Sequence, residues 1–271
     1  MFLERYKLKL AVAALAEKGV FIGTSSWKYP GWFGTIYDRA RYEYRGKFAQ
    51  TRFNRECLWE CADVFKTVCV DAAYYNFSII FQTFPRFGDQ AGKPNENFLN
   101  ADLFAKAFLK TCEAFKRNVS ILLFEFSKFY PSDYQHGRDF VADLDRFLGQ
   151  LPAVWPYGVE IRNKNFLHPE YFAVLKEHNV AHVFNSWSDM PPVSEQMALA
   201  SSRTNSNLCA ARFLLKPGRK YAESVKMFEP YDKVKDSNPD ARAAFCNYSP
   251  MARSETTVQP LTAKAIEVKG R

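Results

Sequence analysis

The chain has 271 residues, 47% of them hydrophobic and 24% charged, and its 37 Lys and Arg against 29 Asp and Glu give a formal net charge of +8. This apolar content excludes an intrinsically disordered chain, and 12 Gly with 14 Pro exclude a fibrous or low-complexity one. The length fits one large globular domain, which we take as 1–271. Because 16% of the residues are aromatic, bulky rings must fill much of the interior or line a large cleft.

The first segment, 1–18, is predicted to be an amphipathic helix. Its apolar run, 10–16, is at the lower length limit of a secretory signal and is followed directly by Glu17 and Lys18. No stretch reaches the ~20 apolar residues of a membrane span, so no membrane partner is expected. Residues 1–55 hold 11 Lys and Arg against 4 Asp and Glu, which indicates either a solvated basic edge or a surface for nucleic acid.

Seven apolar runs rich in Val, Ile, Phe and Ala are typical of strands buried on both faces. They are 19–27, 64–75, 77–84, 119–127, 157–163, 180–187 and 208–216. Four segments between them have the apolar spacing of helices, namely 52–65, 100–117, 137–151 and 169–179. Asn100 is a suitable N-cap for the second of these helices, and 190–207 reads as a loop with a short helix.

The alternation of strands and helices predicts an α/β fold with a parallel sheet. No GxGxxG or GxxxxGK[ST] motif follows a predicted strand, which disfavours the nucleotide-binding forms of an open, doubly wound sheet. We therefore predict a TIM (β/α)8-type barrel over 19–244, followed by an irregular C-terminal tail over 245–271.

Polar residues end several of the apolar runs, where a barrel places its active site. Side-chain alternation along the strands predicts that they meet at the barrel mouth; they are Asp71, Glu125, Glu160, Arg162, Asn185, Arg212 and Lys216. As a catalytic hypothesis, Glu160 is the base and Glu125 the acid, while the Arg and Lys side chains hold an anionic substrate. The alternative is a set of ion pairs that close one layer of the barrel without chemistry.

Metal and covalent catalysis are not predicted. The four histidines have no carboxylate or cysteine partner at ligand spacing; they are His136, His168, His178 and His182. The cysteines show neither a disulfide framework nor a zinc ribbon; they are Cys57, Cys61, Cys69, Cys112, Cys209 and Cys246. Cysteines without a disulfide pattern indicate a reducing, cytoplasmic location. We expect neither a metal nor a tightly bound organic cofactor.

Six segments carry a resemblance to a known family. They are IGTSSWKYPGW (22–32), FKTVCVDAAYYNF (65–77), ILLFEFS (121–127), YGVEIRN (157–163), VFNSW (183–187) and LLKPGRKYAESVKMFEPYD (214–232). From about residue 19 to about 244 the chain resembles the YecE-like family, known as domain of unknown function 72, whose activity is not established. The resemblance implies a TIM-barrel fold and a polar pocket made of Trp27, Trp32, Asp71, Tyr75, Glu125, Glu160, Arg162 and Asn185, with Lys216, Gly218 and Tyr221 after the seventh strand.

Two segments depart from the family pattern. The third βα unit is shortened, so we expect 77–84 to serve as the third strand. The tail lacks the usual last-strand motif, which leaves 244–249 as a weak, irregular eighth strand. A sheet without a proper third or eighth strand exposes unpaired edges, which predicts reduced stability or lost activity.

Three functional hypotheses follow. The first is an uncharacterised TIM-barrel enzyme of hydrolase or lyase type, acting on a phosphate- or sugar-containing small molecule, with a glycosidase-like carboxylate pair as its nearest variant. The second is a non-catalytic barrel that binds nucleic acid or another polyanion through the basic N-terminal fifth. The third is an inactive, degenerate paralogue.

Overall fold

A parallel sheet forms the centre of the protein. The computed structural model describes residues 2–70, 79–80, 82, 92–229, 239–240 and 262–267. Seven of the described strands pair into this sheet: β1 (Val20–Thr24), β4 (Thr67–Val68), β5 (Leu122–Glu125), β6 (Tyr157–Glu160), β7 (Ala181–Ser186), β8 (Leu208–Phe213) and β9 (Thr262–Glu267). All their pairings are parallel. The predicted α/β class and parallel sheet are confirmed.

The strand order follows the chain and then returns to its start. Neighbours run β5, β6, β7, β8, β9, β1, β4, so β1 pairs with the last strand along the chain. Among the described residues, β4 and β5 are the two edges, and no described strand joins them. Five of the eight residues of the predicted third strand, 77–84, lie outside the described residues, and the other three, Ile79, Ile80 and Gln82, are not in a strand; the predicted eighth strand, 244–249, lies entirely outside the described residues.

Strand β9 lies within 245–271, the segment predicted as an irregular tail. Its backbone pairs with β1 from Val20↔Ala263 to Thr24↔Glu267, and with β8 along its other edge. The sequence did not predict this strand, because the segment has no long apolar run of the kind seen in β7 and β8.

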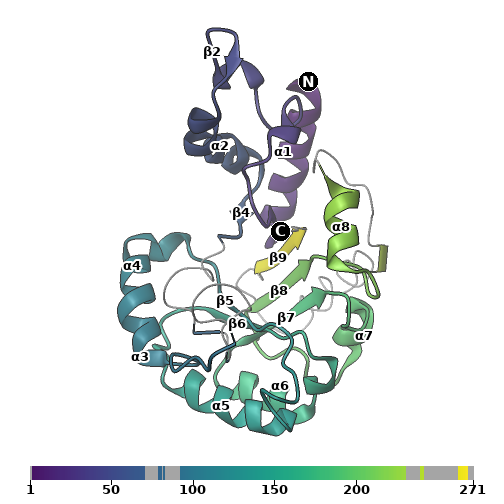
Figure 1. The fold of residues 1–271 in the computed structure, drawn as a ribbon. Coiled ribbons are helices and arrows are strands. Elements are labelled where there is room, and N and C mark those ends of the chain that lie inside the picture. The colour runs from purple at the N-terminus through teal and green to yellow at the C-terminus, as the bar shows by residue number, and fades with distance from the viewer. Residues whose placement is uncertain are drawn as a thin grey trace.

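The helical segments precede or connect the strands, and those between β4 and β8 lie at the periphery of the sheet (Figure 1). The helical segments are α1 (Phe2–Glu17), α2 (Gln50–Val64), the continuous run of α3 (Ala101–Leu103), η3 (Phe104–Leu109), α4 (Lys110–Cys112) and η4 (Glu113–Asn118), then α5 (Gly137–Gly149), α6 (Pro169–Glu177), α7 (Val193–Ala198) and α8 (Tyr221–Phe228). The short elements are η1 (Pro30–Trp32), η2 (Arg39–Tyr42), β2 (Glu43–Tyr44), β3 (Lys47–Phe48) and η5 (Lys164–Phe166). The predicted cap is present, because the Leu103 backbone N–H donates to Asn100 Oδ1 at 2.9 Å.

The main core lies between β5 and β6 and the helices α3 to α6, and phenylalanine rings dominate it. Phe124 of β5 meets Phe104 and Phe147 edge-on, with centroids 5.1 and 5.0 Å apart. Edge-to-face rings fill irregular space densely, so the aromatic content of the chain goes largely into packing that holds these strands rigid.

The N-terminal unit of α1, β2, β3 and α2 projects beyond the sheet (Figure 1). It has its own aromatic cluster around Tyr42 and Phe53, both fully buried. Val12 is the one buried residue among the described side chains of α1, while Leu3 and Leu10 are exposed. This helix therefore lacks the single buried stripe that an amphipathic helix would show. None of the described helices is long and apolar enough to cross a membrane.

Candidate functional site

Two glutamates stand side by side at the carboxyl ends of β5 and β6. Glu125 and Glu160 are the last residues of these strands and are partners in the parallel register. Partners in register place their side chains on the same face of a sheet. The core on either side of them is apolar, so two acids here need cations to offset the free energy of desolvation.

Two arginines supply these cations. Arg162 follows β6 by two residues; it contacts the Glu125 carboxylate and approaches Glu160 Oε1 with its Nε at 3.4 Å. Arg212 on β8 donates from a single nitrogen, Nη1, to both acids, at 2.6 Å from Glu160 Oε2. The structure thus brings together four of the predicted site residues, which we call the four-charge cluster: Glu125, Glu160, Arg162 and Arg212.

The four-charge cluster is buried and electrically balanced. The Glu160 side chain is 0% exposed and those of Arg162 and Arg212 are 12% and 11% exposed, whereas that of Glu125 is 30% exposed. Burial alone would raise the pKa of Glu125, but the charges of Arg212 and Arg162 outweigh it and lower this pKa below its ordinary value. The pKa of Arg212 is raised: burial opposes this, but Glu160 and Glu125 outweigh it. Glu125 is therefore ionised at neutral pH.

Asn185 stands next to Arg212, because the two are register partners on β7 and β8. The Asn185 side chain is fully buried, and its Nδ2 donates to the carbonyl of Ile161 at 3.0 Å. Gln196 of α7 fixes the Asn185 backbone: its Nε2 donates to the Asn185 carbonyl at 2.6 Å. Sequence reasoning missed Gln196, since nothing in the pattern of a short helix distinguishes a buried glutamine from a solvated one.

The loops after β5, β6 and β7 are tied together around the cluster. Asn163 accepts from the Phe129 backbone N–H at 2.8 Å and donates to the Phe129 carbonyl at 2.9 Å. The Arg162 guanidinium lies 3.7 Å from the centroid of the Trp187 ring, a cation–π contact. Lys128 and Asp189 form an ion pair at 2.7 Å between the loops after β5 and β7.

Lys216 and Gly218 lie in the loop after β8, and Tyr221 is the first residue of α8; Lys216 and Tyr221 are half-buried. Gly218 has φ +79°, a left-handed conformation suited to glycine, and its N–H donates to the Ser188 carbonyl at 2.7 Å. This hydrogen bond fastens the loop after β8 to the loop after β7. The three predicted residues thus lie beyond the carboxyl end of β8.

The predicted aromatic site residues are placed differently. Trp32 packs in the N-terminal aromatic cluster, 4.7 Å from Tyr29 and 6.1 Å from Tyr37 between ring centroids. Trp27 is partly buried against the same cluster. Lys28 Nζ also lies 5.5 Å from the centroid of the Trp27 ring, a cation–π contact. The two remaining predicted residues, Asp71 and Tyr75, lie outside the described residues.

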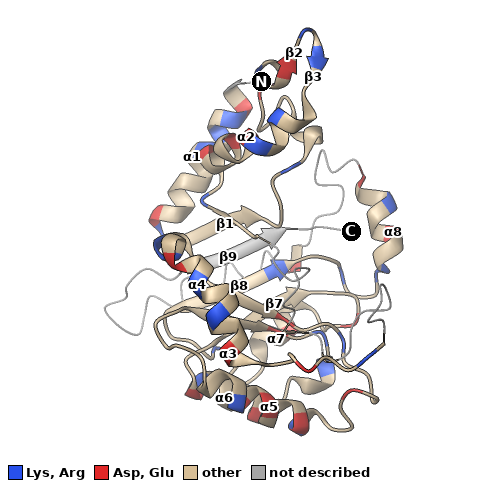
Figure 2. Ribbon diagram, turned by 60° about the vertical axis from the view of Figure 1, so that its left-hand side comes forward, with Lys and Arg blue, Asp and Glu red and all other residues tan. Residues whose placement is uncertain are grey.

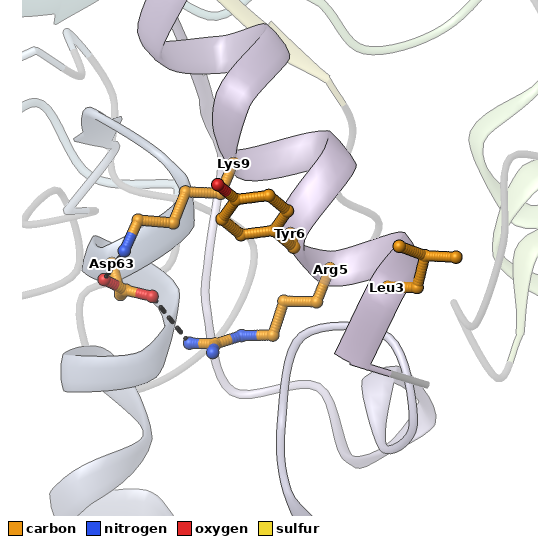
Figure 3. Close-up of a pocket in the computed structure, with 5 residues that line it drawn as sticks. All are labelled: Leu3, Arg5, Tyr6, Lys9 and Asp63. Atoms are coloured by element: carbon orange, nitrogen blue, oxygen red, sulfur yellow. Dashed lines mark hydrogen bonds and ion pairs between the residues drawn. The ribbon is translucent and has the colours of Figure 1, made fainter.

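The basic N-terminal fifth carries both signs of charge, as Figure 2 shows on α1 and α2. A shallow pocket between these helices is lined by Leu3, Arg5, Tyr6, Lys9 and Asp63 (Figure 3). Asp63 accepts from Arg5 at 3.0 Å and from Lys9 at 2.5 Å. Acids of α2 therefore offset part of the positive charge counted over 1–55, and this pocket lies apart from the four-charge cluster.

No group of three or more potential metal ligands occurs in the part of the chain that the structure describes. His182 is buried, with Nδ1 3.1 Å from the Tyr171 hydroxyl, and burial lowers its pKa to about 3. His178 lies 2.6 Å from Asp145 through Nε2. The five described cysteines form no disulfide with one another; they are Cys57, Cys61, Cys69, Cys112 and Cys209.

The separation of the two acids bears on what the cluster can do. Because Glu125 and Glu160 accept from the same nitrogen, these carboxylate oxygens can be no more than about 5–6 Å apart. That spacing falls in the range of retaining glycosidases. However, the Arg212 guanidinium occupies the space between the acids, where a scissile bond would have to lie. The arrangement favours binding over a two-carboxylate hydrolysis.

Comparisons with known proteins agree with one another. A family model described as "Protein of unknown function DUF72" matches residues 95–247, a little over half of the chain. The crystal structure of a DUF72 family protein from Thermotoga maritima MSB8 is similar with a TM-score of 0.53 and 16% identity over 92% of each chain. One from Enterococcus faecalis V583 has a TM-score of 0.51 and 15% identity over 93% of this chain and 90% of that one. At such identities the likeness concerns the fold alone. No curated protein matches the chain.

Proposed function

The chain belongs to the DUF72 family of proteins of unknown function, and from its geometry we propose that the four-charge cluster is the binding site for a small polar ligand of the phosphate- or sugar-containing class. The proposal rests on one observation, the convergence of charged side chains from several strands. Charged side chains from β5, β6 and β8 meet at the carboxyl ends of neighbouring parallel strands, which is where α/β proteins bind ligands. Glu125 leaves the cluster open, since its side chain is 30% exposed.

Any proton transfer at this site falls to Glu125. A base needs an oxygen that its substrate can reach, whereas Glu160 is 0% exposed and both of its carboxylate oxygens are held, Oε1 by Arg162 and Oε2 by Arg212. Glu125 is partly exposed, and its lowered pKa keeps it ionised at neutral pH, so the form that can act as a base is the one present. The geometry thus favours Glu125 as the base and gives Glu160 the role of positioning Arg212, the opposite of the assignment made from the sequence. A hydrolase or lyase reaction would need its acid from another group.

The sheet itself is proposed to belong to a (β/α)8 barrel. Support comes from the strand order, which is a cyclic version of chain order with every pairing parallel. An open doubly wound sheet reverses direction at a switch point, and its first strand does not pair with its last. The one break, between β4 and β5, falls where residues 71–78 and 83–91 would supply the third unit.

The test is to identify small molecules that the purified full chain binds. Extracted protein is analysed by mass spectrometry for retained compounds, and calorimetric titrations then use inorganic phosphate, glucose 6-phosphate and D-glucose. The Glu125→Gln variant keeps the shape of the side chain but removes its charge. The Asp102→Asn variant, which removes an exposed ion pair between Asp102 of α3 and Lys106 of η3, is the control.

We expect a probe to bind the wild type and Asp102→Asn equally and Glu125→Gln at least tenfold more weakly. Equal binding to all three proteins would show that the probe binds away from the four-charge cluster. Binding of none of the small probes, together with salt-sensitive binding of a DNA or RNA oligonucleotide, would replace the proposal with the nucleic-acid alternative. Binding of nothing at all would support the inactive paralogue.

A further inference from the structure

Two buried polar atoms beside the four-charge cluster have no hydrogen-bond partner. They are Oδ1 of Asn185 and Nε of Arg212. Asn185 is 0% exposed and Arg212 is 9% exposed, so water in the bulk does not satisfy either atom. Leaving a buried donor or acceptor unpaired is costly, and such atoms in a cluster at strand ends call for a ligand or an ordered water.

The orientation of each group is fixed by its other hydrogen bonds. The Ile161 carbonyl needs a donor, so it holds Nδ2 of Asn185 and leaves the acceptor Oδ1 unpaired. Nη1 of Arg212 is committed to both glutamates, which leaves the Nε–H as an unpaired donor. Because the two residues are register partners on β7 and β8, their side chains leave the sheet next to each other on one face.

A hydroxyl group fits this pair of atoms better than a charged group does. A hydroxyl accepts from Arg212 Nε and donates to Asn185 Oδ1 through one oxygen. A carboxylate or a fully ionised phosphate ester has no donor for Asn185 Oδ1, and any phosphate would meet the negative charges of Glu125 and Glu160. An ammonium group would leave Arg212 Nε unpaired and would meet both guanidinium groups.

The charge balance of the cluster also favours an uncharged hydroxyl group. Two carboxylates already neutralise two guanidinium groups at hydrogen-bond distance. An anion must displace one of those carboxylates, whereas an uncharged hydroxyl leaves every ion pair in place. Trp187 adds an aromatic wall beside Arg162, of the amphipathic kind suited to a ring with polar edges.

We propose, resting on the function proposed above, that the ligand is an uncharged polyhydroxylated molecule of monosaccharide size and that one of its hydroxyls binds between Asn185 Oδ1 and Arg212 Nε. Asn185 then contributes to specificity, because it requires a donor, which a carboxylate or a fully ionised phosphate group does not offer.

The experiment compares uncharged and anionic probes on the full chain by calorimetry. The uncharged probes are D-glucose, D-ribose and myo-inositol, and the anionic probes are inorganic phosphate and glucose 6-phosphate. For the tightest uncharged probe, the set of its single-deoxy analogues is then titrated. We expect uncharged probes to bind and one deoxy analogue to bind about 10- to 100-fold more weakly, the loss typical of an unpaired buried group.

The Asn185→Ala variant should lose this discrimination, while Asp102→Asn should keep it. If Asn185→Ala fails to fold, as judged by its circular dichroism spectrum, the deoxy series on the wild type decides alone. Binding of the anionic probes only would overturn this inference while leaving the proposed function standing, and binding of no probe would overturn both. A water found between the two atoms in a crystal structure with the polyol bound elsewhere would also overturn it.

Discussion

Glu125 and Glu160 are register partners on adjacent strands, yet they are held together by a residue two strands further along the sheet, since both accept from Nη1 of Arg212. One guanidinium thus links β5, β6 and β8 at their carboxyl ends. A buried charge network of this kind adds little stability as a whole, but removing one member leaves its partner buried and uncompensated. The stability of the sheet therefore depends on the network staying complete.

Replacing Glu160 tests this dependence. We expect Glu160→Gln to lower the free energy of unfolding by about 3 kcal/mol, because Arg212 loses a fully buried counter-charge. Urea denaturation followed by circular dichroism measures the change. The Asp102→Asn variant breaks an exposed pair and should change stability by less than about 1 kcal/mol.

The double variant Glu160→Gln with Arg212→Gln completes the cycle. Because it removes both charges of the pair, it should be less destabilised than the sum of the two single variants. Strict additivity would mean that the two side chains do not interact in solution.

Acidification should weaken the contribution of Glu125. Its pKa is lower in the folded protein than in the unfolded chain, so its ionised form stabilises the fold above an unfolded pKa of about 4.3, and that stabilisation is lost as the pH falls through the folded value. Wild type should therefore be more stable than Glu125→Gln at pH 7, and the difference should shrink below about pH 4.5. Urea denaturation at several pH values measures it.

The control for this pH series is Glu113→Gln, since Glu113 is an exposed partner of Lys116 at 3.7 Å. Its difference from wild type should stay small across the series. A Glu125→Gln difference that remains constant or grows on acidification would show that the two arginines do not control this carboxyl group.

The sequence was sufficient for six of the seven described strands of the sheet and for the charged residues at the ends of β5, β6 and β8. Period-two alternation and apolar runs located Glu125, Glu160, Arg162 and Arg212, because a charge at the end of a buried strand has few other roles. The sequence could not show how these charged residues pair, because nothing in the residues around Arg212 indicates that it bridges two glutamates. Strand β9 was missed because its segment lacks an apolar run, and its place in the sheet is set by the edges of β8 and β1.

The predicted tryptophans illustrate a second limit. Trp27 and Trp32 follow β1 in the chain, which suggested a place at the mouth, but the chain there turns into the N-terminal unit and Trp32 packs against Tyr37. Loop direction depends on long-range packing, so side chains beyond the end of a strand are less predictable than those within it.

The two hydrogen bonds of Asn163 to Phe129 should hold the loop that follows Glu125. Removing them in Asn163→Ala leaves the backbone of Phe129 without these partners, and we expect a loss of about 1–3 kcal/mol in the free energy of unfolding. Asn163→Asp keeps the acceptor for the Phe129 N–H and loses the donor to its carbonyl, so it should lie between wild type and Asn163→Ala. Equal stability of Asn163→Ala and wild type would contradict this role.

A glycine in β1 sets how closely β4 can approach. A Cβ on Gly23 would lie 2.2 Å from the backbone oxygen of Thr67, its register partner, so Gly23→Ala must push the two strands apart. We expect a cost of about 3 kcal/mol or more in urea denaturation. Gly158→Ala is the comparison, since its nearest atom is the terminal methyl of Ile121 at 2.6 Å, which can rotate away, and it should cost about 1–3 kcal/mol. A larger cost for Gly158→Ala than for Gly23→Ala would mean that the edge strand β4 moves more easily than the packed methyl groups around β6.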